Sequence, residues 1–142
     1  MRFGFTRYAV AIVAALFALT APALAHHSFA AEFDLNKPVH LEGVVVLMEW
    51  VNPHSWLHVD VVQEDGSVAR WAVEGGAPSA LLRRGWNRNS LPPGTNVNIE
   101  GFQAKDGSFR ANARDIEFPD GTSLFIGSAR TGAPYEESED KE

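Results

Sequence analysis

The sequence predicts a small, mainly β domain: an OB-like antiparallel barrel of five to six strands with one short helix. Three Asp-Gly turn signals, EDGS at Glu64, KDGS at Lys105 and PDGT at Pro119, separate segments in which apolar and polar residues alternate. One helix-like stretch lies between the first two hairpins, and this order of elements is typical of an OB-type barrel. A small open β-sandwich built from the same hairpins is the alternative.

The first expected strand covers residues 39–50, VHLEGVVVLMEW, which are rich in β-branched and apolar side chains. Gly43 lies within this strand and is a natural position for a bend or a bulge. The next segment, WVNPHSW, contains Pro53, which has a fixed φ angle and pushes Asn52 toward extended geometry. We therefore expect a rigid corner that carries His54 at the mouth of the barrel.

The first hairpin is expected to turn through a three-residue loop at residues 64–66. A two-residue loop would mix apolar and charged side chains on one face, whereas the three-residue loop gives one apolar face. The pairs predicted by this register are Leu57–Val73, Val59–Trp71, Val61–Ala69 and Asp60–Arg70.

The same loop length at residues 105–107 predicts a second hairpin, and a third hairpin turns around residues 119–121. The pairs expected in the second hairpin are Ile99–Ala113, Gly101–Ala111 and Gln103–Phe109, and the third returns residues 123–126 along Ile116 and Phe118.

Residues 77–84 form the expected helix, because Pro78 suits a first helical position and Gly85 follows the last turn. Leu81 and Leu82 on this helix are expected to plug the barrel.

Residues 1–25 have the form of a secretory signal peptide, with Arg2 and Arg7 before an apolar stretch and a small-x-small site at Ala23-Leu24-Ala25. The apolar stretch is too short for a transmembrane helix, and no later segment is apolar enough to span a bilayer. We therefore expect a periplasmic protein with a β-barrel domain at 26–128. Residues 129–142 are expected to be an acidic disordered tail.

Loss of two arginines with the signal peptide would leave ten basic against 18 acidic residues, a net charge of −8. Such a charge argues against nucleic acid as a partner, because phosphate binding needs a basic surface. Cysteine is absent, so a metal ion would be bound by nitrogen and oxygen atoms. No serine has a nucleophile-elbow setting and no buried carboxylate pair is evident, so the sequence predicts no enzyme.

Cleavage after Ala25 would make His26 the first residue of the mature chain. Its α-amino group and Nδ1 atom would chelate one ion, and a further imidazole would complete a T-shaped site suited to copper(II) or another divalent transition metal. His27 offers a competing mode through the amine, a deprotonated amide and its own imidazole. His54 is the first choice for the additional imidazole because its corner is rigid. The simpler interpretation of the two histidines is a solvated or docked terminus.

The alternative function is binding of a ligand other than a metal ion by the corner and the outer face of the second strand. The residues expected to contribute are Trp50, Asn52, Trp56 and His58, and the same outer face carries Asp60, Arg70 and Glu74 as hydrogen-bonding groups. The simplest interpretation of this face is a surface ion pair beside a shielded Trp56. A third hypothesis is an envelope protein partner that pairs with an exposed edge strand. His40 and His58 are otherwise expected to be surface side chains.

Four segments in the same order, HHSFAAEFD, EWVNPHSW, LLRRGWNRNSL and the stretch from KDGS to SLFIGS, resemble domain-of-unknown-function family 6152. The resemblance covers the chain from His26 to about Ser128. It implies a signal peptide, a periplasmic location in a Gram-negative bacterium and a small β-rich domain. It implies no activity, so the metal hypothesis depends on the chemistry of this chain.

Overall fold

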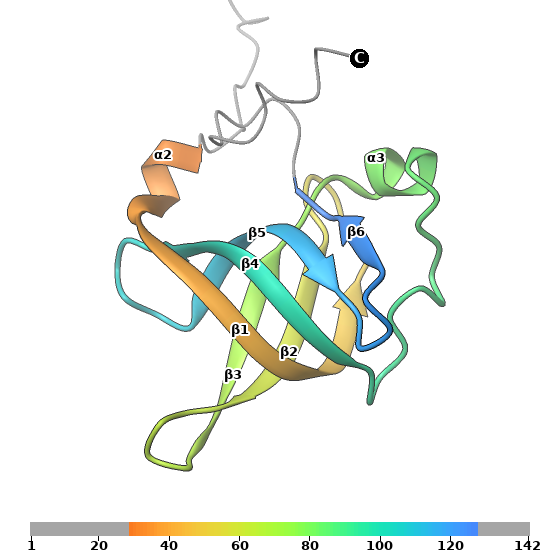
Figure 1. Ribbon diagram of the computed structural model, residues 1–142. Helices are drawn as coiled ribbons and strands as arrows, with labels where there is room; N and C mark the ends of the chain where they lie inside the picture. The colour runs from red at the N-terminus through yellow and green to blue at the C-terminus, as the bar shows by residue number, and fades with distance from the viewer. Residues whose placement is uncertain (1–28, 128–142) are drawn as a thin grey trace, which may run out of the picture.

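The computed structural model describes residues 29–127 and consists of six strands and two short helices (Figure 1). The elements are α2 (Phe29–Glu32), β1 (Phe33–Glu49), β2 (Trp56–Val62), β3 (Val68–Glu74), α3 (Pro78–Arg83), β4 (Asn96–Ala104), β5 (Arg110–Glu117) and β6 (Ser123–Phe125). The predicted signal peptide, His26, His27 and the predicted acidic tail lie outside the described residues.

All six strands belong to one sheet, in the order β3-β2-β1-β4-β5-β6, and a further pairing of β3 with β5 closes the sheet into a ring. The long strand β1 makes this possible, because it pairs with β4 over its first part and with β2 over its second. The prediction of a mainly β fold is confirmed. One detail was wrong: α2 is a second helix that was not expected. The closing β3–β5 pairing is parallel, whereas the other pairings are antiparallel as predicted.

The predicted register of the first hairpin is confirmed. Leu57 lies opposite Val73 and Val59 opposite Trp71, while Asp60 lies opposite Arg70. The Arg70 guanidinium donates two hydrogen bonds to the Asp60 carboxylate, at 2.8 and 3.0 Å. One face of the hairpin is therefore apolar and buried, and the other carries an exposed ion pair.

The predicted register of the second hairpin is wrong, by two residues near the turn and by three at Ile99, which pairs with Ile116 and not with Ala113. Gly101 pairs with Ala113, not Ala111, and Gln103 pairs with Ala111, not Phe109. The cause is a longer turn. The Phe109 carbonyl accepts a hydrogen bond from the Ala72 amide at 2.9 Å, so Phe109 joins the closure with β3 instead of facing Gln103.

The third hairpin is as predicted, since Ile116 pairs with Leu124. The first strand begins at Phe33, earlier than expected. Its pairing is irregular between Val45 and Leu47 on the β2 side and between Phe33 and Pro38 on the β4 side, and not at Gly43. Gly43 is needed for a different reason. A Cβ atom there would lie 2.9 Å from the Asp60 carbonyl oxygen, so a side chain does not fit.

Helix α3 matches its prediction to within one residue at each end, with Ala77 as N-cap. Leu81 is fully buried in the core as expected, but Leu82 is 54% exposed and does not plug the ring. The buried Trp86 closes this end, and its Nε1 donates to the Phe125 carbonyl at 3.1 Å.

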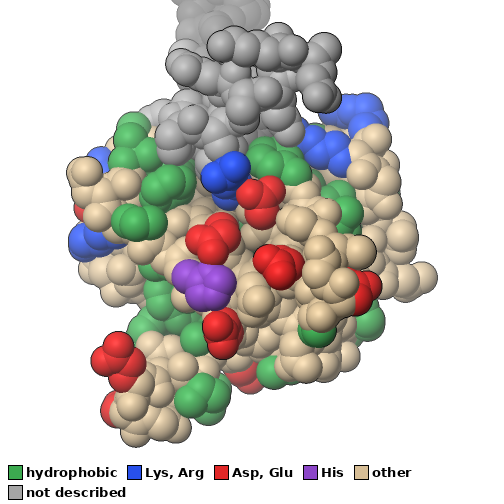
Figure 2. All heavy atoms as spheres, in the orientation of Figure 1, with side chains coloured by type: hydrophobic (Ala, Val, Ile, Leu, Met, Phe, Trp, Pro, Cys, Tyr) green, Lys and Arg blue, Asp and Glu red, His purple; other side chains and the backbone are tan. Residues whose placement is uncertain are grey.

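Acidic side chains gather on the outer face over β1 and β4 (Figure 2). His40 lies among them, with Nδ1 2.5 Å from Glu100 and Nε2 3.5 Å from Glu42. The hydrogen bond that the His40 imidazole makes to the Glu100 carboxylate raises the pKa of His40 above 6.5. Its side chain is 51% exposed, in agreement with the expected surface position.

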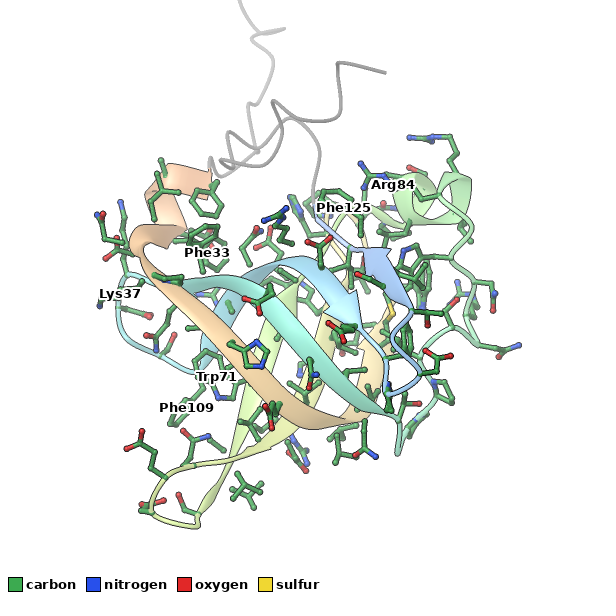
Figure 3. All side chains as sticks on the ribbon, viewed as in Figure 1. Phe33, Lys37, Trp71, Arg84, Phe109 and Phe125 are labelled. Atoms are coloured by element: carbon green, nitrogen blue, oxygen red, sulfur yellow. The ribbon has the colours of Figure 1, made fainter. Side chains whose placement is uncertain are left out.

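The main hydrophobic core fills the inside of the ring, and a smaller cluster of Phe29, Phe33 and Ala104 holds α2 against β4. Trp71 lies at one end of the core against Phe109 from the β4–β5 turn, with ring centroids 5.4 Å apart (Figure 3). At the α3 end the Arg84 guanidinium lies over the Phe125 ring, 4.6 Å from its centroid.

The same hydrogen-bonding device stabilises each of the three Asp-Gly turns. In every case an aspartate Oδ1 accepts from the backbone amide and the hydroxyl of the residue two positions later, at 2.9 and 2.6 Å; the pairs are Asp65–Ser67, Asp106–Ser108 and Asp120–Thr122. These hydrogen bonds lower the pKa of all three aspartates below 3.8.

Gly101 should be among the least replaceable residues of the fold. A Cβ atom there would overlap the Asn112 carbonyl oxygen in the facing strand. We expect Gly101→Ala to lower the free energy of unfolding by about 3 kcal/mol, at the upper end of overpacking costs.

Gly121→Ala is the matched control, because Gly121 has a φ of 80° but open space around it. Its cost should be limited to about 1 kcal/mol of backbone strain. Urea unfolding of both variants measures the difference, and equal losses would refute the steric explanation.

Candidate functional site

A pocket of about 210 Å³ lies where α2, the corner after β1 and the ends of β3 and β5 meet. Its lining residues are Glu32, Val51, Asn52, Pro53, His54, Trp56, Glu74 and Arg110. The pocket combines two carboxylates, one guanidinium, one imidazole and an indole ring, so most of its lining is polar or charged.

Backbone hydrogen bonds fix the corner that carries His54. The Ser55 amide donates to the Gly76 carbonyl at 3.0 Å, and the Gly75 amide donates to the Ser55 carbonyl at 2.9 Å. The buried Ser55 hydroxyl also donates to the Gly76 carbonyl. The Asn52–Pro53 peptide bond is cis. The corner is thus tied directly to the end of β3, which supplies Glu74.

His54 and Glu74 form an ion pair in the wall of the pocket, with Nδ1 3.0 Å from Oε1. Their side chains are only 16% and 10% exposed. The Glu74 hydrogen bond is the largest influence and raises the pKa of His54 above 6.5, while burial opposes it. A hydrogen bond with the Gly75 backbone and the negative charge of Glu32 raise this pKa further. Glu74 therefore orients the imidazole and favours its protonated form.

Arg110 connects α2 to the second strand across the pocket. Its Nη2 donates to Glu32 Oε2 at 3.0 Å, and its guanidinium carbon lies 5.4 Å from the centroid of the Trp56 ring. A cation above an aromatic face at this distance is a favourable contact. Arg110 is thereby held by a carboxylate on one side and by an aromatic ring on the other.

Phe29 anchors α2 beside the pocket. It is 2% exposed, and its ring lies 5.7 Å from that of Phe33 and 5.5 Å, edge to face, from that of Phe102. The Lys105 amide also donates to the Glu32 carbonyl at 2.9 Å. The start of the described chain is therefore docked, because burial of a phenylalanine ring outweighs the weak stability of a four-residue helix.

The structure brings three of the sequence-predicted residues together in this pocket, namely Asn52, His54 and Trp56. Two others lie elsewhere. Trp50 packs against the core, with the Arg88 guanidinium 5.9 Å from its ring centroid, and His58 lies 3.2 Å from Glu49 outside the pocket lining.

Sequence reasoning placed Glu74 on the outer face beside Trp56, but it did not assign Glu32 or Arg110 to a site. The confirmed hairpin register already places Glu74 opposite Trp56, so that neighbour was available from the sequence. Glu32 and Arg110 had no such signal, because their positions depend on the docking of α2 and on the parallel closure of the sheet.

Within residues 29–127, no group of three or more histidine, aspartate or glutamate side chains is arranged to hold a metal ion. His26 and His27 are not among these residues. In the same part of the chain, no helix has the length and apolar character needed to cross a membrane.

The His54–Glu74 pair makes stability depend on pH with a defined sign. The pKa of His54 in the folded protein is raised above 6.5. The stabilisation that the charged imidazole gives to the fold is therefore complete below pH 6.5 and is lost as the pH rises through this raised pKa. We expect the difference in unfolding free energy between wild type and His54→Gln to shrink as the pH rises through this range.

In a proton NMR titration, Glu74→Gln should move the His54 midpoint down toward 6.5. An unchanged midpoint would contradict the conclusion that Glu74 raises the pKa of His54.

No curated protein and no solved structure gives a significant match to this chain. One family model does match, over residues 14–113, and that range includes α2, the corner with His54, the end of β3 and Arg110. The match covers more than half of the sequence. The chain therefore belongs to the family of unknown function DUF6152.

Proposed function

We propose that this chain is a periplasmic OB-like module that binds one divalent transition metal ion, such as copper(II), through its mature amino terminus and His54. The position of α2 carries the proposal. This helix begins three residues after His26 and ends at Glu32, which lines the same pocket as His54. The predicted first residue of the mature chain is thus tethered to one wall of the pocket.

The tether is short. Three extended residues span at most about 10 Å, so His26 is confined to that distance from the buried Phe29. A longer or undocked arm would lose more conformational entropy on binding the ion, because the cost of closing a flexible segment grows with its length.

The donor set suits copper(II). The α-amino group and Nδ1 of His26 would form the chelate, with His27 as the competing mode. On His54, Nδ1 faces Glu74 at 3.0 Å, so Nε2 is the nitrogen that would bind the ion. A carboxylate behind a metal-binding imidazole fixes its orientation and raises its basicity.

The pairing scheme supports an OB-type barrel as the scaffold. In this scheme β1 pairs with both β2 and β4, β3 pairs with β5 in parallel, and α3 lies between β3 and β4. The signal-peptide features of residues 1–25 support export to the periplasm.

A sugar or another non-metal ligand on Trp56 is the less favoured function. Arg110 already covers the Trp56 ring, so a stacked ligand would have to displace it from both the ring and Glu32. The other expected contributors, Trp50 and His58, do not line the pocket. The metal proposal requires no such displacement of the indole contact.

The decisive test compares two amino termini. Protein purified from the periplasm, with its first residue established by intact mass, is titrated with copper(II) beside a variant that carries one extra alanine before His26. Removing the terminal chelate should weaken binding roughly 100-fold, about 2.7 kcal/mol. Equal affinities for the two termini would reject the proposed function.

Glu74→Gln tests the carboxylate that orients His54 without removing a proposed metal ligand. Loss of a carboxylate that supports a ligating histidine should weaken copper binding about 10- to 100-fold. Glu49→Gln is the matched control, because Glu49 makes a similar contact, 3.2 Å from His58, outside the pocket. Isothermal titration should show a loss only for Glu74→Gln, and equal effects of both variants would contradict the site.

A further inference from the structure

We propose that the outer edge of β3, from Val68 to Trp71, is a docking site for an extended peptide segment of another protein. The docked segment would add one strand to the sheet, next to the start of β5. This inference is independent of the proposed function, because the edge lies outside the pocket lining and involves no metal ion.

The ring is closed over only part of β3. Strand β2 pairs with β3 along its whole length, from Val68 to Glu74. On the other side β5 pairs only with residues 72–74, and no other strand within residues 29–127 pairs with β3. Residues 68–71, in the part of β3 nearest the β2–β3 turn, therefore have a neighbouring strand on one side alone (Figure 1).

Val68 and Arg70 direct their backbone groups to the open side. The Ala72 amide donates to the Phe109 carbonyl at 2.9 Å, on the side of β3 away from β2. Because the direction of the backbone groups alternates along an antiparallel pair, Val68 and Arg70 face the same way as Ala72. Within the described part of the chain, their amides and carbonyls have no backbone partner on this side.

The chemistry of the edge defines its occupant. A row of backbone donors and acceptors is matched by another extended backbone, which is how sheet edges bind peptide strands. The surrounding side chains favour an apolar segment, since Val68 is 62% exposed and Phe109 is 49% exposed. The neighbouring turn carries Glu64 and Asp65, so a basic residue at that end of the segment would complement their charge.

Trp71 is a second, independent sign of a missing partner. Its Nε1 is buried and has no acceptor among the residues that the structure describes. Such a group destabilises the fold, because it has lost water without gaining a hydrogen bond. The Trp71 ring packs against Phe109, where β5 takes over the edge, with centroids 5.4 Å apart (Figure 3). A carbonyl group of a docked segment would supply the acceptor.

A second copy of this chain fits the edge less well. If two β3 edges paired in antiparallel fashion, Val68 of each copy would lie opposite Arg70 of the other. The residues before Val68 would then meet residues 71–72 of the other copy, where Phe109 and Arg110 already lie. A free segment has no flanking turn, so it avoids this overlap.

Hydrogen exchange with a model peptide tests the docking. The probe is acetyl-VTVTVK-amide, and its control carries proline in place of the central valine, which removes a backbone donor. With the probe, the amides of Val68 and Arg70 should exchange several-fold more slowly, whereas the amide of Ala69, which faces β2, should not change. Lack of protection at millimolar probe, or equal protection by the control peptide, would overturn the proposal.

Two substitutions at one position separate the backbone from the side chain. Val68→Pro removes one edge donor without removing a hydrogen bond to β2, and edge strands accept proline in this orientation. Its affinity for the probe should fall about tenfold, the effect of one lost hydrogen bond. Val68→Ala keeps the amide and should bind nearly as well as wild type. Equal losses in NMR titrations would overturn the backbone-edge explanation, and thermal unfolding checks that both variants are folded.

The remaining outcomes are read from the same samples. The indole N–H signal of Trp71 should move as the probe binds, and an unmoved signal would overturn the role of Trp71. If sedimentation shows that the free protein dimerises and that the dimer protects Val68 and Arg70, a second copy covers the edge and the proposal fails. Val68→Pro should bind copper(II) like wild type, so failure at this edge leaves the proposed function unaffected.

Discussion

The parallel contact between β3 and β5 is the constraint on which the rest of the molecule depends. Only three residue pairs form it, Ala72 with Arg110, Val73 with Ala111 and Glu74 with Asn112. They convert an open sheet into a ring, and the ring encloses the core. The same three pairs bring the end of β3 beside the start of β5. This one contact therefore positions both Glu74 and Arg110 in the pocket lining.

The pocket is organised as two linked ion pairs on a rigid frame. His54 and Glu74 are fixed by the corner and β3, whereas Arg110 and Glu32 bridge β5 and the docked α2. Each positive group faces a carboxylate, so the pocket has little net charge when His54 is protonated.

The sequence predicted best what local chemistry decides. Turn residues and alternating side chains defined the first hairpin, and Pro78 with Gly85 bounded α3. The second hairpin was shifted because Phe109 bonds to β3, a contact between distant segments that no turn rule contains. Helix α2 was missed because four residues are too few for a helical period.

The same distinction applies to the site. Asn52, His54 and Trp56 were predicted because a proline-stiffened corner is visible in a short sequence window. Glu32 and Arg110 were not, because they meet only after the sheet closes and α2 docks. His26 and His27 remain predictions, since they lie outside the described residues.

Trp71 has a spectroscopic consequence. Its indole nitrogen is buried and finds no acceptor among residues 29–127, and its ring packs against Phe109. An indole in such dry surroundings emits at shorter wavelength than one in contact with water. Trp86 at the α3 end is buried as well, so emission at the blue edge reports the integrity of both ends of the ring.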